Sequence, residues 1–592
     1  MKFWRFIVGV FALIGLLAVL LMAGVAAVTY NYLRFGGLEP AAPDSIVLRL
    51  DLRQGPPDRP PADPLFRRFD GGPVTLRELV DAVDRAAGDP RVAGMVGIFG
   101  GDAFGLATAQ ELRDAVRRFR DGGKFALAYA DSLGEAGPGN TSYYLASSFD
   151  EVWLMPLGSV GLTGIRAEVP FAREALDEFG LTPEFDRRGA YKSFPEMLTE
   201  ERFTPTNREM TESLVGDLFN QLVAGIAEAR GRSAADVAAL IDGAPYTAEE
   251  ALAAGLVDRL AQRPDLRAEI ESRAGEAAET LDAADYLAVA PAAAAEDPAR
   301  FALIYATGTI TLGRGDDDPL FGGRLMSADT VSDAIEQAID DPDIAAIVVR
   351  IDSGGGSAVA SEVIGETVRR ATAEDKPLIV SMGGAAASGG YWIAAGAREI
   401  VAQPATLTGS IGVFAGKVVT DGMWQDLGVN WQGVQRGRNA DLWSATTPYS
   451  ADGGARLGAM LDAIYGGFLD RVADGRGLDR ADVEAVAQGR VWTGDQALSL
   501  GLVDRLGGLD VAMRAAREAA GLSEDAAVEL TVLPLLPTPL ERLLELASGG
   551  GLRGGARADA ALARLDPYLR HLEPLLTPPG EQLLRMPEIT LQ

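Results

Sequence analysis

Apolar and polar positions follow the periods of strands and helices over most of this chain. Short runs such as Ser45–Leu50 (SIVLRL) and Pro377–Met382 (PLIVSM) predict buried strands, whereas Thr75–Ala87 and Ala328–Ile339 repeat apolar residues at helical spacing. Because the strands alternate with longer helices, we expect βαβ units and largely parallel sheets. The fold class that this pattern predicts is α/β.

A long apolar run lies near the N-terminus. Ile7–Val28 carries no charge, and basic residues precede it at positions 2 and 5. Such a run extends about 33 Å as a helix, close to the roughly 30 Å of a bilayer core. We expect residues 1–5 in the cytoplasm, a transmembrane anchor at 6–33, and the bulk of the chain outside the cytoplasm. A cleaved signal peptide, with Val25–Ala27 as its cleavage site, is the alternative.

From about residue 45 to residue 535 the sequence repeats itself once. The clearest pair is Tyr246–Leu260 (YTAEEALAAGLVDRL) and Trp492–Leu506 (WTGDQALSLGLVDRL). The offset between equivalent positions falls only from 256 (301 − 45) to 246 (492 − 246) along the chain. We therefore predict two tandem copies of one α/β unit, the first at 45–290 and the second at 299–535.

Segments of other composition frame the two copies. Residues 34–44 are predicted to be a linker that follows the anchor, and an Ala-rich stretch at 291–298 is the predicted linker between the copies. Residues 536–592 are expected to be a loosely ordered tail, and an amphipathic segment that binds a partner is the alternative.

Composition narrows the possible chemistry. The net charge is −30, from 84 acidic and 54 basic residues, which argues against nucleic-acid binding because no basic excess is present to neutralise phosphates. The chain has no cysteine, so a thiolate nucleophile, a thiolate zinc site and an iron–sulfur cluster are excluded. Its one histidine, His571, lies in the tail, so acyl-transfer chemistry would need Lys, Asp or Glu as its general base.

The first candidate site residue is Ser388, in the stretch Gly383–Trp392 (GGAAASGGYW). A predicted strand leads into this stretch, and a small-residue helix at Tyr391–Arg398 leads out. Backbone N–H groups at the start of a helix stabilise developing negative charge, so a hydroxyl at this place suits a nucleophile. An ordinary Gly-rich turn is the alternative for this stretch alone.

The two copies have lost different groups. Ser388 lies opposite Asn140 (388 − 248), and Lys192, in the stretch AYKSFPE, lies opposite Ala440 (440 − 248). One copy keeps a lysine without the serine and the other a serine without the lysine, which predicts a site assembled between the copies. Lys192 can act as a base only if burial lowers its pKa. A surface lysine on a polar loop is the alternative.

Two further motifs belong to the second copy. Asp352–Ser357 (DSGGGS) follows a strand and opens a helix, so Gly355 and Gly356, together with Gly389 beside Ser388, are candidate oxyanion donors. An ordinary turn is the alternative, and a phosphate site is disfavoured because no lysine follows the glycines as in a P-loop. Ser410, in TLTGSIG, is a candidate partner for the lysine amine, although a tight turn explains it equally well.

SGGGS, AAASGGYW, LTGSIGV, AYKS and the duplicated GLVD element resemble signal peptide peptidase A, also called protease IV, in its long two-copy form. The resemblance covers about residues 45–535. It implies a ClpP/crotonase-like fold and a serine–lysine peptidase, with Ser388 as nucleophile, Lys192 as general base and Ser410 positioning the lysine. The sequence departs from the family pattern at Ser353–Gly356, where SGGG stands in place of Ser-Pro-Gly-Gly. Loss of the proline is expected to make the turn more flexible.

The same resemblance implies an N-terminal anchor, a catalytic body on the periplasmic side of a bacterial inner membrane, and a bowl-shaped homotetramer. The implied substrates are signal peptides left in the membrane after cleavage, and no cofactor or metal is expected. Two alternatives stay open: a crotonase-type acyl-CoA enzyme and an inactive membrane-anchored scaffold. A serine-directed probe distinguishes the peptidase from the scaffold, and a CoA-binding assay distinguishes it from the acyl-CoA enzyme.

Overall fold

The computed structural model describes residues 43–60, 73–290, 298–315, 324–374 and 376–534, together with the backbone of 584–585 and 590–591. The predicted anchor at 6–33, nearly all of the linker at 34–44, residues 291–297 of the linker at 291–298 and most of the tail lie outside these residues. Within the described part of the chain, no helix is both long enough and apolar enough to cross a bilayer.

The first copy forms a parallel sheet of six strands in the order β10-β1-β2-β3-β4-β9. Its strands are β1 (Ile46–Asp51), β2 (Val92–Phe99), β3 (Phe125–Ala130), β4 (Glu151–Leu154), β9 (Arg259–Leu260) and β10 (Glu279–Asp282). The helices are α3 (Leu76–Gly88), α4 (Leu106–Asp121), α5 (Asn140–Ala146), α6 (Arg173–Glu178), α7 (Glu196–Thr199), α8 (Pro205–Arg230), α9 (Ala234–Asp242), α10 (Ala248–Ala253), α11 (Arg263–Ala274) and α12 (Ala283–Val289).

The second copy repeats this order as β22-β11-β14-β16-β17-β21, with all of these neighbours parallel. Its strands are β11 (Ala299–Thr307), β14 (Ile344–Ser353), β16 (Leu378–Ala387), β17 (Glu399–Ala402), β21 (Arg505–Leu506) and β22 (Val528–Leu533), and β18 (Leu407–Gly409) and β20 (Val491–Thr493) extend the sheet beyond β16. The helices are α13 (Ala328–Asp340), α14 (Ala358–Ala373), α15 (Gly389–Ala394), α16 (Asp421–Asp426), α17 (Ala451–Arg476), α18 (Arg480–Val486), α19 (Gly494–Ser499) and α20 (Leu509–Ala519). The sequence prediction of a duplicated parallel α/β unit is confirmed at the level of strand order.

Shorter strands complete the structure. They are β5 (Ser159–Val160) with β8 (Tyr246–Thr247), β6 (Ala167–Glu168) with β24 (Thr590–Leu591), and β12 (Thr309–Thr311), β13 (Leu325–Ser327), β15 (Gly355–Gly356) and β23 (Leu584–Arg585) in one small sheet.

Both sheets are buried on two faces, as parallel sheets with helical crossovers are. On β14, Ile347 and Val349 belong to the core with α13 and α14, whereas Val348 packs with α20 on the other face. The helices begin where their sequences place caps: Thr75 and Glu78 form a reciprocal capping box at the start of α3. Four apolar side chains of α3 then face the core at helical spacing: Leu76, Leu79, Val80 and Val83.

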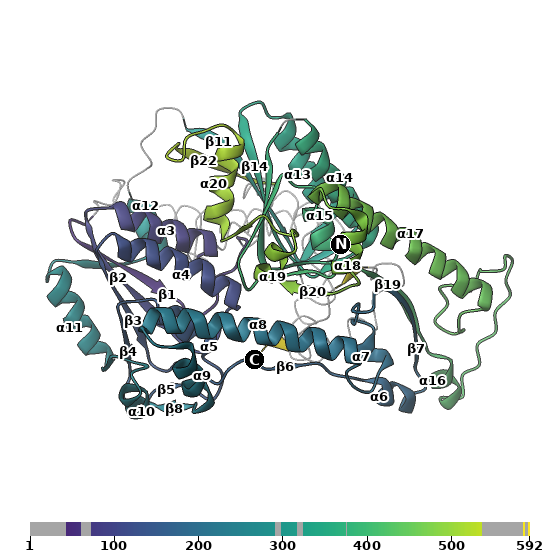
Figure 1. Cartoon of the computed structure of the whole chain (residues 1–592), viewed down its shortest axis with the longest axis horizontal. Coiled ribbons are helices and arrows are strands. Elements are labelled where there is room, and N and C mark those ends of the chain that lie inside the picture. Colours follow the sequence, from purple (N-terminus) through teal and green to yellow (C-terminus); the bar gives the residue numbers. More distant parts are fainter. Residues whose placement is uncertain are drawn as a thin grey trace, which may run out of the picture.

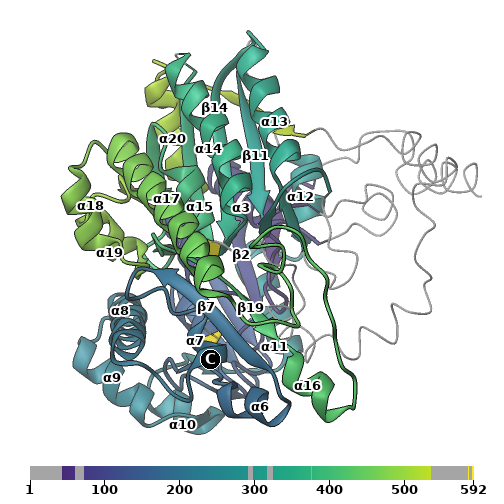
Figure 2. The same cartoon turned by 90° about the vertical axis from the view of Figure 1, so that its right-hand side faces the viewer.

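The two copies are joined by more than their linker. β7 (Thr182–Arg188) of the first copy pairs antiparallel with β19 (Val413–Val419) of the second. In Figure 1 the first copy lies on the left and the second at upper right, and α8 runs beneath both. Figure 2 shows the β7–β19 ribbon beside α17. This ribbon carries the loop that follows β7 into the second copy.

Candidate active site

Ser388 lies at the turn between β16 and α15. Its side chain is fully buried, and its φ of 55° with ψ of −114° is uncommon for a residue with a Cβ. The Ser388 N–H donates to the carbonyl of Gly409 at 2.8 Å, which holds the turn on β18. The helix that follows begins at Gly389, where first-turn N–H groups have no acceptor within the helix. The sequence therefore places backbone N–H donors of a buried helix start beside the Ser388 hydroxyl.

Lys192 reaches this turn from the first copy. It follows β7 and is fully buried, with 0% of its surface exposed. Its Nζ lies 2.7 Å from Ser388 Oγ, 3.0 Å from Ser410 Oγ and 3.0 Å from the Ser410 carbonyl oxygen. The structure thus brings together the serine and the lysine that the two copies retain separately, and it does so within one chain.

Burial lowers the pKa of Lys192 well below its ordinary value of 10.5, and desolvation is the cause. The three contacts suit a neutral amine, because the Ser410 carbonyl and hydroxyl oxygens accept its two N–H groups. Its lone pair then faces the Ser388 hydroxyl. An amine in this state can remove a proton from Ser388 Oγ.

Ser410 also sits in a left-handed conformation, with a φ of 53°. It follows β18, is fully buried, and donates its N–H to the Arg490 carbonyl at 2.7 Å. That hydrogen bond fixes the backbone that presents both Ser410 oxygens to the lysine. Ser410 therefore meets the geometric requirement for a residue that holds the amine in place.

The turn at Gln488–Gly489 holds the Lys192 loop, a contact that no motif considered above predicts. Tyr191 N–H donates to the Gln488 carbonyl at 2.8 Å. Gly489 has a φ of +77°, and a Cβ there would lie 2.5 Å from Lys192 N. Only a glycine allows this approach. The isolated glycine in VAQGRVW is the signal that could have marked it.

The first copy braces the same loop from behind. Arg187 donates to the Lys192 carbonyl at 3.1 Å and to Glu196 Oε1 at 2.5 Å. Glu196 is itself buried and accepts from Thr204 and Asn207 at 2.9 Å each. Phe194 stacks on Phe414 of β19, with ring centroids 5.0 Å apart. The lysine is therefore held by both copies.

The predicted oxyanion glycines lie next to the serine turn. A Cβ on Gly389 would be 3.3 Å from Gly355 Cα, so the two Gly-rich segments touch. Gly355 already donates its N–H to Ser353 Oγ at 3.1 Å, because this hydroxyl folds back onto its own turn. Gly356 pairs with Ile310 of β12. Of the three predicted glycines, Gly355 is therefore the one whose N–H is already committed to another acceptor.

An extended segment of the chain lies along this turn. Leu584–Arg585 pairs antiparallel with Gly355–Gly356, which makes β23 the neighbour of β15. The edge of the Gly-rich turn can therefore hold another chain in β-conformation. The described residues contain no group of three or more His, Cys, Asp or Glu side chains suited to a metal ion.

A serine hydroxyl and a buried lysine amine at hydrogen-bonding distance, beside free helix N–H groups, define the class of serine-type peptidases. Comparisons with known proteins support the same class. The sequence model of Peptidase family S49 matches residues 118–276 and 370–523, one segment in each copy.

Protease 4 of Salmonella typhi is 33% identical over 464 residues, which cover 76% of this chain and 73% of the relative. Serine protease SPPA, chloroplastic, of Arabidopsis thaliana is 30% identical over 491 residues, 82% of this chain and 71% of the relative. A solved mutant of the 1510-N membrane-bound stomatin-specific protease covers 40% of this chain and 97% of its own, at 16% identity and a TM-score of 0.24.

The chain is a serine-type peptidase. It belongs to Peptidase family S49.

Proposed function

We propose that this protein is a membrane-anchored endopeptidase that uses Ser388 as nucleophile and Lys192 as general base. The observation that carries the proposal is the 2.7 Å contact between a fully buried lysine amine and a fully buried serine hydroxyl from two different copies. Burial lowers the pKa of this lysine, which supplies the neutral base that the chemistry needs.

Catalysis follows the acyl-transfer route. Lys192 Nζ takes the Ser388 proton while Oγ attacks a peptide carbonyl, and the resulting oxyanion is held by the N–H groups of Gly389 and Gly356. The Lys192 ammonium then gives its proton to the leaving amine as the C–N bond breaks. A water molecule, deprotonated by the same amine, releases the acyl group and restores Ser388.

The substrate is an extended peptide that pairs with β15. The antiparallel pairing of Leu584–Arg585 with Gly355–Gly356 supports this mode, because the same edge would take a substrate backbone by β-augmentation. We propose apolar peptides as the substrates, in particular remnants of cleaved signal peptides, as the resemblance to signal peptide peptidase A implies.

We also propose that residues 6–33 anchor the protein in a bacterial inner membrane, with the catalytic body on the periplasmic side. The uncharged run Ile7–Val28 and the basic residues before it support this orientation. Such a site would meet signal peptides where they are released.

Self-association is the remaining part of the proposal. Within the chain, Ala405 of the second copy packs on Ala107 and Leu218 of the first, and its N–H donates to Gln110 Oε1 at 2.9 Å. The position equivalent to Ala405 in the first copy is Leu157 (405 − 248), and the one equivalent to Ala107 in the second is Val359 (107 + 252).

Both of these equivalent positions are exposed, at 93% for Leu157 and 56% for Val359. The surface around Leu157 corresponds to one side of the contact between the copies, and the surface around Val359 corresponds to the other side. Leu157 of one chain could therefore contact Val359 of the next, which supports head-to-tail association into the homotetramer that the resemblance implies. Leu157→Asp and Val359→Asp are expected to prevent ring closure singly. An equimolar mixture of the two variants should form dimers, because each retains one intact half; light scattering measures the outcome.

The activity is tested by hydrolysis of a short apolar peptide or an activated ester by the full chain in detergent. Ser388→Ala and Lys192→Ala should both abolish turnover, and a serine-directed fluorophosphonate should label the wild type but not Ser388→Ala. Full activity of Ser388→Ala would overturn the mechanism. A folded wild type that neither hydrolyses nor is labelled would overturn the peptidase function.

A further inference from the structure

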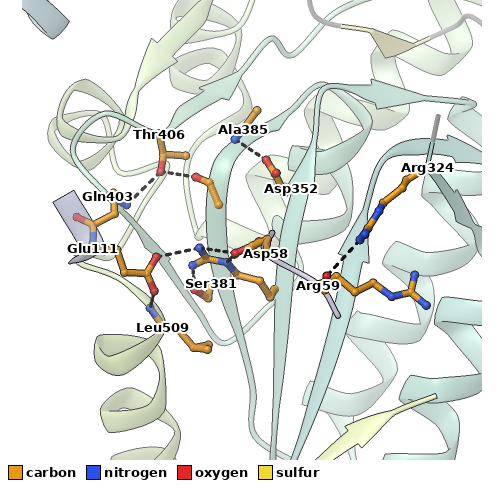
Figure 3. A network of polar contacts seen from close by, with 12 residues as sticks. Asp58, Arg59, Glu111, Arg324, Asp352, Ser381, Ala385, Gln403, Thr406 and Leu509 are labelled. Carbon is orange, nitrogen blue, oxygen red and sulfur yellow. Dashed lines mark hydrogen bonds and ion pairs between the residues drawn. The ribbon is translucent and has the colours of Figure 1, made fainter. Parts of the chain in front are cut away.

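A buried ion cluster lies at the junction of the two copies, outside the active site. Arg350 of β14 donates to Asp58 at 3.0 Å, to Glu111 at 2.8 Å and to Ser381 at 2.9 Å, and its side chain is only 4% exposed. Figure 3 shows Asp58 and Glu111 converging on one guanidinium. The first copy therefore supplies two carboxylates, and the second copy supplies the cation between them.

The segments that carry the two carboxylates are tied to the first copy. Asp58 follows β1, and the Pro57 carbonyl beside it accepts from Leu76 N–H at the start of α3. Glu111 lies on α4 and also accepts from Leu509 N–H, at the start of α20, at 2.7 Å. Glu111 is thus held by the guanidinium and by the positive end of a helix of the second copy.

The duplication shows that this cluster is not part of the repeated fold. The position equivalent to Arg350 in the first copy is Ile98 (350 − 252), and the one equivalent to Glu111 in the second is Val363 (111 + 252). The cluster is therefore present where the copies face each other and is missing at the equivalent positions 98 and 363. The best-attested role of buried ionic groups is to fix how two structural elements align. Removing one partner of such a group leaves an uncompensated buried charge, which is strongly destabilising.

The cluster also lies against an irregular stretch of the strand that leads to Ser388. In the pairing of β14 with β16, Ile351 lies opposite Met382 but Ser353 lies opposite Ala386, so three residues, 383–385, lie opposite Asp352 alone. Such a bulge re-aims the strand beyond it. Here it sets the direction of Ala386–Ala387, the last residues before the serine.

Side chains from several segments hold the bulge. Asp352 accepts from Ala385 N–H at 2.9 Å, and Thr406 Oγ donates to the Gly383 carbonyl at 2.8 Å. A Cβ on Gly383 would lie 3.3 Å from Asp58 Oδ2. The Asp58 carboxylate of the first copy therefore packs closely against the bulge. The position of the first copy and the course of the nucleophile strand are therefore coupled at this point.

We propose that Arg350, together with Asp58 and Glu111, is a positioning residue for the split Ser388–Lys192 pair. It locks the first copy, which carries the lysine, onto the bulge that aims the serine. This inference rests on the proposed function for its kinetic consequence, but its structural consequence is measurable without catalysis.

The test compares Glu111→Gln and Arg350→Lys with Asp510→Asn. Asp510 of α20 pairs with Arg118 of α4 at 3.1 Å, so the control breaks an ion pair between the two copies in which no residue of the Arg350 cluster or of the bulge takes part. Glu111→Gln keeps the shape and the acceptor for Leu509 N–H. Arg350→Lys keeps the charge but loses the planar fork that reaches both carboxylates.

We expect kcat to fall about 10²-fold in Glu111→Gln and Arg350→Lys with little change in KM, because small displacements of a reacting group have effects of this size. Asp510→Asn should keep wild-type kcat. Arg350→Met, which strands two carboxylates, should be less active than Arg350→Lys. If Arg350→Met does not fold, the two conservative variants still decide the question.

Hydrogen exchange gives the readout that does not need catalysis. The amides of 383–388 should exchange about tenfold faster in Glu111→Gln than in the wild type and be unchanged in Asp510→Asn. Equal exchange and equal kcat in Glu111→Gln and Asp510→Asn would overturn the positioning role. A wild type without activity but with the expected exchange pattern would overturn the proposed function and leave the positioning of the strand standing.

Discussion

The two copies share one strand order, yet they differ at the position that holds the nucleophile. In the second copy Ser388 is strained, with a φ of 55°, and its hydroxyl faces a buried amine. In the first copy Asn140 begins α5, and its side chain closes a local bridge: Nδ2 donates to the Gly164 carbonyl at 3.0 Å and Oδ1 accepts from Gly164 N–H at 2.9 Å. In the second copy a residue of left-handed φ thus meets a buried amine, whereas the Asn140 side chain of the first copy is satisfied locally.

The same contrast holds for the base. Lys192 is buried between the copies, whereas its counterpart Ala440 is exposed in a loop without strand pairing. Each copy of the repeated unit has thus kept one of the two groups that the proposed mechanism needs. The proposed active site requires both copies, so a change in one copy should affect the group supplied by the other.

The largest effect is expected from removing either reacting group. Ser388→Ala and Lys192→Ala should each lower kcat by about 10⁴-fold or more, and the double variant should be no worse, because groups that act as a unit are not additive. Ester hydrolysis with active-site titration measures this. A Lys192→Ala enzyme within tenfold of the wild type would contradict the split pair.

The next effect concerns the contact between the copies at Gly489. Gly489→Ala places a Cβ against Lys192 N and should lower kcat about 10²-fold by displacing the amine. Gly521→Ala is the matched control, since Gly521 has a φ of +72° but nothing within 4 Å of its added Cβ. Similar losses of kcat in both variants would assign the effect to backbone strain instead.

The pH dependence follows from the state of Lys192. Because burial lowers its pKa, the neutral base is present only above this lowered value, so kcat/KM should rise with pH, about tenfold per unit, and then level off. Between the lowered pKa and 10.5 the unfolded chain binds the extra proton, so stability should rise with pH across this window.

Lys192→Met removes that burial penalty. It should abolish activity while raising Tm at neutral pH, as calorimetry would show. A lower Tm for Lys192→Met would mean that the hydrogen bonds of the amine outweigh its desolvation.

A smaller effect is expected from the C-terminal segment on β15. Deleting residues 584–592 frees the edge of Gly355–Gly356 and should lower KM for a short peptide about threefold with kcat unchanged, because competition within the chain is lost. Deleting 590–592 alone removes only the pairing of β24 with β6 and serves as the control. An unchanged KM in the longer deletion would exclude competition at this edge.

No effect at all is expected from restoring a hydroxyl in the first copy. Asn140→Ser in a Ser388→Ala background should regain neither hydrolysis nor fluorophosphonate labelling, because Ala440 offers no base. Labelling of a serine at position 140 would show that the first copy has kept a working oxyanion site.

The sequence was enough to predict the α/β class, the duplication and the three residues that meet at the site. Ser388 and Ser410 stood out in Gly-rich turns, and comparison of the copies then linked Ser388 to Lys192 through reciprocal losses, a signal that needs no knowledge of distances. The helix expected at Tyr391–Arg398 instead begins at Gly389 and ends at Ala394, since small residues define helix ends poorly.

Some contacts in the structure have no counterpart in the hydrophobic periodicity of the sequence. The turn at Gln488–Gly489 and the cluster around Arg350 arise from contacts between segments far apart in the chain, and an arginine in a strand predicts no partner. The commitment of Gly355 N–H to Ser353 Oγ depends on a side-chain rotamer, which the sequence does not encode.

The loop of Lys192 rests on Gly489, which is 297 residues further along (489 − 192). A growing chain therefore presents the amine long before the hydroxyl, and the turn that holds them together emerges later still. Any product that ends before residue 388 has a base and nothing to activate. Because the proposed Ser388–Lys192 pair exists only in the finished chain, the order of synthesis would keep incomplete molecules inactive, as a removable pro-segment does in other peptidases.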